Sequence, residues 1–253
     1  VLPVAAQVFP SPPLNAEATF TEVLGGTSMT LTFDGTSYWS CSGGSSAGVR
    51  YAQYTAAGAP VATYSPGIDF RSVYTLGGTV FARGFNNMSL FQQTAPGVFG
   101  SAGVTLAGTV DPQSAVVPNG PATELIALSG GAVQRWSLAG AALGTVPLVG
   151  FGSQNSENTY PQNRGVAAVG SHWFTYSNGV LSAWDAGGNR VAQATLVGAG
   201  TSFDSHFSLS YANGRIWIVD LAGGSWRGYP VAAQQIDDRA GDRPRLRLVH
   251  GGH

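Results

Sequence analysis

The sequence predicts an all-β fold, most simply a β-propeller of five four-stranded blades, and three observations support this prediction. Glycine and proline make up about a fifth of the chain, with 36 Gly and 14 Pro among 253 residues. Charged residues are only 10% of the chain, against about 25% in average soluble domains, which leaves little material for solvated helices. A short motif recurs about every 40–48 residues, which is the spacing expected of propeller blades.

The recurring motif consists of an aromatic or polar residue, three further residues, and a glycine that starts a turn. Five copies run along the chain, the last of them without its glycine: Tyr54–Gly58, Gln93–Gly97, Trp136–Gly140, Trp184–Gly188 and Tyr229–Ala233. Stacked blades must bury large apolar faces against each other. We therefore expect the aromatic residues of the motif to pack between neighbouring blades.

A second turn precedes a β-rich run about twenty residues before each copy of the motif. These turns are Asp34–Gly35, Gly77–Gly78, Asn119–Gly120, Gly170 and Asn213–Gly214. Asp-Gly and Asn-Gly favour type I′ hairpins, because both central residues must adopt positive φ. Each unit thus predicts four antiparallel strands. A sandwich of five hairpins is the alternative, although it would not repeat in register.

The repeats predict one propeller domain over residues 20–235, with an N-terminal segment (1–19) and an Arg-rich C-terminal tail (236–253). The last unit lacks a clear fourth strand. We expect the run Val4–Phe9 to supply it, because closing the ring with an N-terminal strand removes an exposed sheet edge. The tail run Arg245–Val249 is expected to dock as an extra strand, to contact a partner, or to stay solvated.

The charge and the cysteine content limit which partners and which cellular compartment fit this protein. All 12 basic residues are Arg, and they balance 13 acids to give a net charge of −1, so neither a nucleic-acid partner nor an anionic membrane surface is expected. No apolar run is long enough to insert into a membrane. Cys41 is the only cysteine, and we expect it to be buried. The chain starts at Val1 without Met, and we expect a processed protein that is secreted, periplasmic or at the cell surface.

Two segments carry a resemblance to known repeats. Val180–Val191 and Val133–Gly140 resemble the third-strand segment of secreted bacterial propellers with quinoprotein-like and related repeats. The resemblance implies the fold and not an activity, because such repeats occur in propellers of many functions. Residues that match the cofactor-binding positions of quinoproteins are not identifiable, and vicinal cysteines are impossible with one Cys. We therefore expect no cofactor.

Polar residues recur in the segments that lead into the innermost strands. The equivalent segments are Asp69–Ser72, Asp111–Ser114, Tyr160–Asn163 and Asp204–Phe207, whereas the first blade offers Gly26 and Ser28 with Glu17 and Glu22 nearby. Because blades are related by rotation, these side chains should surround one mouth of the central channel. The predicted ligand-binding residues are Arg71, Gln113, Gln162, Arg164 and His206. Asp residues at such corners also fit a turn-capping role.

The function that best fits these features is a non-catalytic binding or assembly module, lectin-like or adhesive, whose partner is a glycan or a protein. A structural subunit of a larger surface assembly is one alternative. The other is a glycoside hydrolase that resembles five-bladed arabinanases, and its carboxylates would come from the set Asp69, Asp111, Asp204 and Glu157. The Asp residues recur at equivalent positions, which favours a structural role over catalysis. The four His residues show no paired ligand spacing, so no metal site is expected.

Overall fold

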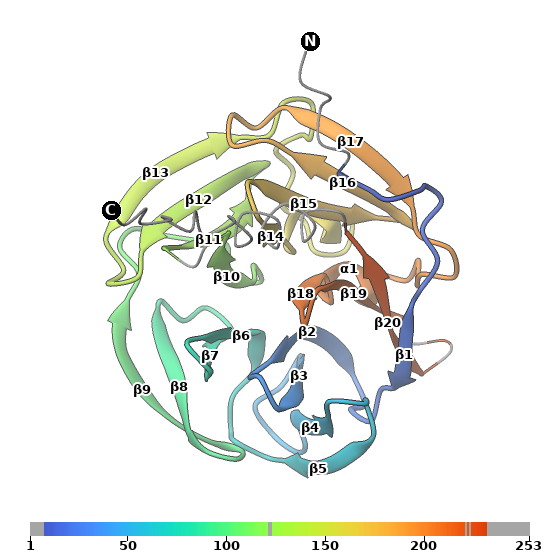
Figure 1. Cartoon of the computed structure of the whole chain (residues 1–253). Helices are drawn as coiled ribbons and strands as arrows, with labels where there is room; N and C mark the ends of the chain where they lie inside the picture. The colour runs from blue at the N-terminus through green and yellow to red at the C-terminus, as the bar shows by residue number, and fades with distance from the viewer. Residues whose placement is uncertain (1–7, 121–122, 221, 223, 232–253) are drawn as a thin grey trace, which may run out of the picture.

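The structure, a computed structural model, describes residues 8–120, 123–220, 222 and 224–231. Five four-stranded antiparallel sheets, the blades, are arranged in a ring around a central axis (Figure 1). In the first four blades the strands follow one another in chain order, whereas the fifth blade takes its last strand from the N-terminal part of the chain. The predicted five-bladed, all-β architecture is confirmed.

The strands of each blade are given from the innermost to the outermost. Blade 1 comprises β2 (Thr27–Phe33), β3 (Ser37–Gly43), β4 (Tyr51–Thr55) and β5 (Pro60–Tyr64). Blade 2 comprises β6 (Phe70–Leu76), β7 (Thr79–Gly84), β8 (Ser89–Ala95) and β9 (Val98–Thr105). Blade 3 comprises β10 (Val116–Asn119), β11 (Glu124–Ser129), β12 (Ala132–Ser137) and β13 (Ala142–Pro147).

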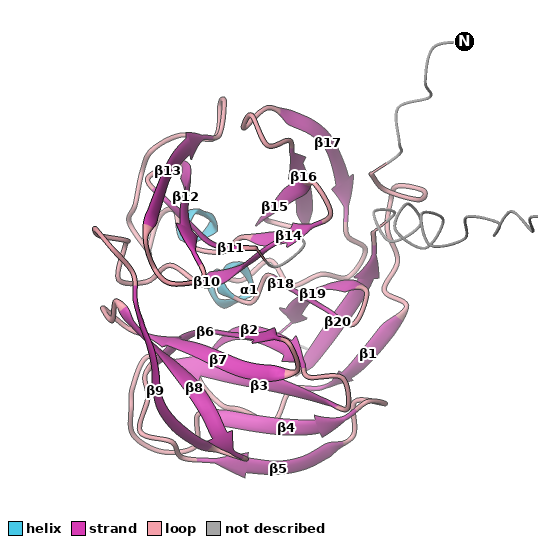
Figure 2. Ribbon diagram, turned by 60° about the vertical axis from the view of Figure 1, so that its left-hand side comes forward, coloured by secondary structure: helices cyan, strands magenta, loops and turns pink. Residues whose placement is uncertain are grey.

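Blade 4 comprises β14 (Ala167–Val169), β15 (His172–Ser177), β16 (Val180–Trp184) and β17 (Arg190–Thr195). Blade 5 comprises β18 (Ser210–Ala212), β19 (Arg215–Asp220), β20 (Ser225–Pro230) and β1 (Ala18–Thr21). Two short helices, η1 (Pro161–Asn163) and α1 (Phe203–Phe207), precede the innermost strands of blades 4 and 5. Both views place α1 toward the centre of the ring (Figures 1 and 2).

An N-terminal strand closes the ring, as predicted, but it is not the predicted segment. Strand β1 pairs antiparallel with β20, with Phe20 opposite Trp226. The assignment of this strand to Val4–Phe9 was wrong. Residues 4–7 lie outside the described part of the chain, and Phe9 is buried with its ring edge-on to Phe174, 6.1 Å between centroids. Phe9 therefore fills the core between blades 4 and 5 instead of pairing along a sheet edge.

The hydrophobic core is divided into five clusters, one between each pair of neighbouring blades. Tyr54, Trp136, Trp184 and Tyr229 are buried in four different clusters, where each packs against the preceding blade. The prediction for the motif aromatics is thus confirmed. In blade 2 the motif begins with Gln93, which is half-buried.

The motif glycines have two reasons to be glycine. All four have positive φ, between 72° and 87°, where a side chain is strained: Gly58, Gly97, Gly140 and Gly188. Each also lies against the end of the preceding blade. A Cβ at Gly188 would be 2.1 Å from the Pro147 carbonyl oxygen. The repeated glycine is therefore a contact point between blades as well as a turn residue.

The predicted type I′ hairpin is present at Asn213–Gly214, where both residues have positive φ of 46° and 77°. It is absent at Asp34–Gly35, where only Gly35 has positive φ. The reason is the Asp34 carboxylate, which accepts hydrogen bonds from the Ser37 N–H at 2.8 Å and the Trp39 indole N–H at 2.6 Å. These bonds hold a longer loop in place of a two-residue turn.

Hydroxyl side chains join neighbouring innermost strands around part of the channel. Thr30 Oγ1 donates to the Val73 carbonyl at 2.8 Å and accepts the Val73 N–H at 2.6 Å. Ser72 makes the same pair of bonds with Val116, and Ser210 Oγ accepts the Leu31 N–H. Backbone groups at the inner edges of these sheets are satisfied in this way by side chains of the neighbouring blade.

The remaining sequence predictions concern the tail, the membrane and the cysteine. The tail, including Arg245–Val249, lies outside the described residues. Within the described residues, no helix has the length and apolar character needed to cross a membrane. Cys41 is buried and its thiol faces the Thr30 carbonyl at 3.6 Å, and burial raises the pKa of this thiol above its ordinary value. Such a thiol is unreactive.

Candidate functional site

All nine predicted site residues lie on one face of the ring, the entry face, which we define as the side from which the innermost strands start. Asp69 and Arg71 precede and begin β6, Asp111 and Gln113 precede β10, and the others precede β14 or β18. The turns between the second and third strands of each blade reach the same face. The rotational argument from the sequence therefore placed these residues on a common surface.

Their recurrence has a structural cause. In three of the interfaces, between blades 1 and 2, 3 and 4, and 4 and 5, a side chain of one entry segment accepts a backbone N–H from the second-to-third-strand turn of the preceding blade. Gly44 N–H donates to Asp69 Oδ1 at 2.8 Å, and Gly131 N–H donates to Asn163 Oδ1 at 3.0 Å. Asn178 N–H donates to His206 Nε2 at 3.2 Å. These polar residues thus connect neighbouring blades in three of the five interfaces.

Asp69 is also neutralised by a buried arginine. Arg71 Nη1 lies 2.7 Å from Asp69 Oδ1 and donates to the Phe70 carbonyl at 2.6 Å. The Arg71 guanidinium lies 4.7 Å from the centroid of the Phe85 ring, a cation–π contact. The Arg71 side chain is only 4% exposed, so its guanidinium lies beneath the surface of the entry face.

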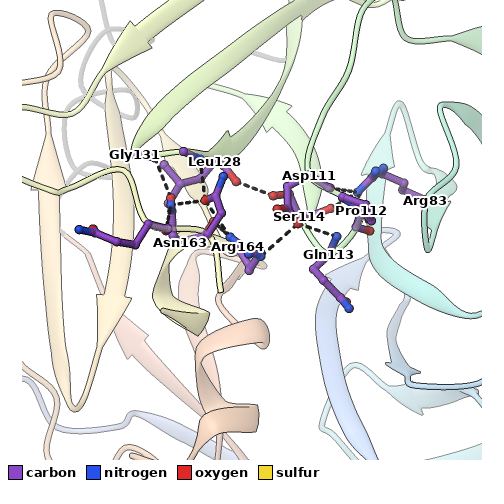
Figure 3. A network of polar contacts seen from close by, with 12 residues as sticks. Arg83, Asp111, Pro112, Gln113, Ser114, Leu128, Gly131, Asn163 and Arg164 are labelled. Carbon is purple, nitrogen blue, oxygen red and sulfur yellow. Dashed lines mark hydrogen bonds and ion pairs between the residues drawn. The ribbon is translucent and has the colours of Figure 1, made fainter. Parts of the chain in front are cut away.

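A second buried arginine, Arg83, fixes the entry segment of blade 3 (Figure 3). Its Nη1 donates to the carbonyl oxygens of Asp111 and Ser114, and its Nε donates to that of Asn87 at 3.0 Å. No carboxylate pairs with Arg83 among the described residues. Burial, reinforced by the charge of Arg71, lowers the pKa of Arg83 to about 10. Sequence reasoning missed this residue, because an arginine at the end of an apolar strand resembles an ordinary surface charge.

Asp111 forms an ion pair with Arg164 that connects blades 3 and 4, with 3.1 Å between Oδ1 and Nε (Figure 3). Arg164 is buried, and its Nη1 donates to Asn155 Oδ1 at 2.9 Å. Burial lowers the pKa of Arg164, and the charges of Asp111 and Glu157 oppose this effect. Asn155 also accepts the Gly130 N–H at 2.8 Å. The long loop before η1 is therefore fastened to blade 3.

Helix α1 covers the channel on this face. Phe207 reaches from α1 into the core cluster between blades 1 and 2, and the backbone of His206 lies against Gly165 of the blade 4 segment. His206 is buried, with Nδ1 2.9 Å from the Ser202 carbonyl oxygen. A carbonyl only accepts, so the proton sits on Nδ1, and Nε2 is the acceptor for Asn178. Both ring nitrogens are thus engaged within the protein.

Four predicted residues keep half-buried side chains without a hydrogen bond to another described side chain or backbone group: Gln113, Glu157, Gln162 and Asp204. Gln113 projects away from the Arg83 and Arg164 contacts (Figure 3). Next to it lies the turn that carries Phe85, because Asn86 N–H donates to the Pro112 carbonyl at 3.3 Å. Phe85 is 44% exposed and was not singled out from the sequence. The ligand-binding role of the predicted residues stays a prediction.

The described residues contain no group of three or more His, Cys, Asp or Glu side chains that could hold a metal ion. Gln113 and Gln162 offer hydrogen bonding through their amides, Phe85 offers an aromatic ring, and Glu157 and Asp204 add two half-buried carboxylates.

Comparisons with known proteins identify the architecture. No family model matches the chain, and no curated protein matches it in sequence. The solved structure of Myxococcus xanthus glutaminyl cyclase matches with a TM-score of 0.63 and 13% identity over 87% of this chain and 98% of that chain. The chain is a five-bladed β-propeller.

Two other solved structures match more distantly. The WD40 propeller domain of Doa1 has a TM-score of 0.47 at 12% identity, covering 85% of this chain and 96% of that chain. Virginiamycin B lyase from Staphylococcus aureus has a TM-score of 0.41 at 14% identity, covering 81% of this chain and 67% of that chain. At such identities the likeness of this propeller to solved structures concerns the fold alone.

Proposed function

We propose that this propeller is a non-catalytic binding module of an exported or cell-surface protein. Its ligand contacts the entry arc, which we define as Phe85, Gln113 and Gln162. The observation that carries this proposal is the contrast between the charged groups of the entry face and these three side chains. Asp69 and Asp111 are held in ion pairs with buried arginines, whereas the two amides have no described partner.

A glycoside hydrolase is less well supported by the same geometry. Its mechanism needs a pair of carboxyl groups in distinct environments, one of them protonated when the substrate binds. Asp69 and Asp111 have the same environment, since each faces an arginine that is almost fully buried. Each also fixes backbone N–H groups, of Gly44 and Gln113 respectively. These bonds give both carboxylates a structural task.

The entry arc suits a neutral, hydroxyl-rich ligand such as a glycan. A glutamine amide offers two donors and one acceptor oxygen, so it can hydrogen-bond to hydroxyl groups in either sense. The Phe85 ring has Arg71 near it and is 44% exposed, which leaves ring surface for stacking on an apolar sugar face. Surface residues fixed by a rigid scaffold are well suited to recognition, because little ordering cost accompanies binding.

The test asks whether one protein sample binds glycans without converting any substrate. A glycan array, a panel of chromogenic glycosides and a glutaminyl cyclase assay are run together with a solution mass measurement. We expect glycans to bind and no substrate to be consumed. Turnover in either activity assay would contradict the proposal, and binding to no glycan with a mass well above 26.0 kDa would instead favour a structural subunit of an assembly.

Variants then locate the ligand. The double variant Gln113→Ala with Gln162→Ala and the single variant Phe85→Ala should each lower affinity about tenfold or more, because each removes contacts of about 1.5 kcal/mol. Arg190→Ala on the outer strand β17 is the matched control and should bind like the parent protein. Unchanged affinity in both entry-arc variants, with unchanged unfolding curves, would place the ligand elsewhere.

A further inference from the structure

The interface that closes the ring contains a buried carboxyl group. Glu22 follows β1 directly, and its side chain lies between blades 5 and 1 with 9% exposure. Its Oε1 accepts the Leu24 N–H at 2.6 Å and the Tyr54 O–H at 3.2 Å. The Glu22 backbone N–H donates to the Gly224 carbonyl of blade 5 at 2.8 Å. One residue thus contacts both sides of the closure.

Several polar atoms near Glu22 are buried without a hydrogen-bond partner in the described part of the chain. They are Glu22 Oε2, Ser28 Oγ, Ser42 Oγ and Trp226 Nε1. Ser42 lies on the same face of β3 as Ser40, whose hydroxyl contacts the Tyr54 hydroxyl at 3.2 Å, and Ser28 is the register partner of Ser42. The indole of Trp226 faces the carboxyl group and favours its ionised form, although it lies outside hydrogen-bond geometry.

No basic side chain compensates this carboxyl group among the described residues. The titratable group that faces it is the Tyr54 hydroxyl on β4, which is neutral, whereas the Cys41 thiol on β3 points to the other side of blade 1, into the core cluster between blades 1 and 2. None of the described ion pairs includes Glu22. An ionised Glu22 would therefore be an unpaired buried charge with one oxygen that accepts no hydrogen bond, which is a costly state.

We propose that Glu22 is a proton-binding latch: near neutral pH the folded protein takes up one proton on this carboxyl group, and that proton strengthens the closure between β1 and β20. Burial is the main reason that the pKa of Glu22 rises to about 7 from its ordinary value of 4.5. The unfolded chain ionises near the ordinary value, so the folded state holds the extra proton between these two values. Stability from this group is complete below about pH 4.5 and is lost as pH rises through 7.

Two measurements follow from this. Between pH 5 and pH 8 the unfolding equilibrium constant of the parent protein should rise about a hundredfold through this group, since each pK unit corresponds to a factor of ten. The amide protons of β1 should exchange faster at pH 8 than their intrinsic rates account for, because the closing strand opens more often. Both effects are measured on the protein without a ligand, so they are independent of the proposed ligand.

The experiment compares three proteins by urea unfolding and amide hydrogen exchange at pH 5, 6, 7 and 8. Glu22→Gln keeps an acceptor for Leu24 and Tyr54 but removes the titration, so it should lose this rise. Glu17→Gln is the matched control at the other end of β1, where the carboxylate is 52% exposed and 3.5 Å from Arg215, and it should keep the parent's pH dependence.

An identical pH dependence in Glu22→Gln and the parent protein would overturn the proposal. If Glu22→Gln does not fold, infrared difference spectra of the parent protein and of Glu17→Gln test the proposal instead. A protonated carboxyl band that disappears with a midpoint near pH 7 supports the latch. Absence of any protonated carboxyl band above pH 6 contradicts it.

Discussion

Ser72 and Val116 are joined across two blades by a pair of hydrogen bonds: the Ser72 hydroxyl donates to the Val116 carbonyl at 2.7 Å and accepts the Val116 N–H at 3.0 Å. One hydroxyl thereby satisfies both backbone groups of a residue at the inner edge of the next sheet. Thr30 does the same for Val73, so the innermost strands of blades 1, 2 and 3 are connected through side chains.

This relationship predicts a large effect of a small deletion. Ser72→Ala should lower the free energy of unfolding by about 2–4 kcal/mol, because two buried backbone groups lose their partner. Urea unfolding measures the change. Ser89→Ala, which removes an exposed hydroxyl from β8, is the control and should alter stability by less than about 0.5 kcal/mol. Similar values for the two variants would show that water replaces the Ser72 bonds without cost.

The glycine that starts each outer turn predicts a second contrast. Gly188 and Gly67 have similar φ values of 80° and 76°. A Cβ added at Gly188 would meet the Pro147 carbonyl, whereas a Cβ added at Gly67 would have no atom within 4 Å. Gly67→Ala should cost about 1–2 kcal/mol from backbone strain alone. Gly188→Ala should cost a further 1–3 kcal/mol or so, because the new Cβ forces two blades apart. Thermal unfolding of both variants checks this, and equal shifts in Tm would mean that the blade contact adjusts freely.

The contacts of Arg83 predict that this buried arginine, which has no described carboxylate partner, contributes more to the free energy of unfolding than a partly exposed ion pair does. Arg83→Met should lower the free energy of unfolding by about 3 kcal/mol or more, since the carbonyls of Asn87, Asp111 and Ser114 lose their donor. Arg135→Met, which breaks the partly exposed pair with Glu124, should cost about 0–1 kcal/mol. The reverse order of the two effects would contradict the assignment of Arg83 as the clamp of the blade 3 entry segment.

The contacts of His206 predict that acid lowers the stability of the helix that covers the channel. Burial lowers the pKa of His206, and its Nε2 must stay unprotonated to accept the Asn178 N–H. The stability from this group is therefore complete above pH 6.5, the ordinary value, and is lost as pH falls below it. This sign is opposite to that of Glu22.

Unfolding of the parent protein and His206→Gln at pH 7.5 and pH 5 measures the effect. The variant keeps a side chain that can accept the Asn178 N–H but does not titrate, so it should lose less stability on acidification. His172→Gln, at a half-buried position on β15, should behave like the parent. Equal acid sensitivity of His206→Gln and the parent would place the titrating group elsewhere.

The fold could be predicted from the sequence because its main determinants are local and repeated. The motif from Trp184 to Gly188 combines an aromatic residue that packs on the preceding blade with a glycine that permits the turn, and both signals lie within five residues. The closing strand was harder to place. Val4–Phe9 was the segment expected to close the ring, but Ala18–Thr21 pairs with β20, and Phe9 packs against Phe174.

The entry face shows what a single sequence hides. The recurrence of polar residues such as Asp69 and His206 in equivalent segments was visible, but the groups that these two bind, the N–H of Gly44 and of Asn178, belong to turns about 25–28 residues earlier in the chain. Arg83 and Glu22 gave no signal of their own, because their importance comes from burial without a charged partner. Burial of a charged group follows from tertiary packing and not from local pattern.

The pairing of β1 with β20 also sets when the protein can be completed during synthesis. The fifth sheet joins residues 18–21 to residues 225–230, so it cannot form until nearly the whole propeller has left the ribosome. Blades 1 to 4 need only consecutive strands and can form their sheets earlier. A chain that stops before β20 leaves an incomplete circle with two open edges, which makes truncated products targets for aggregation.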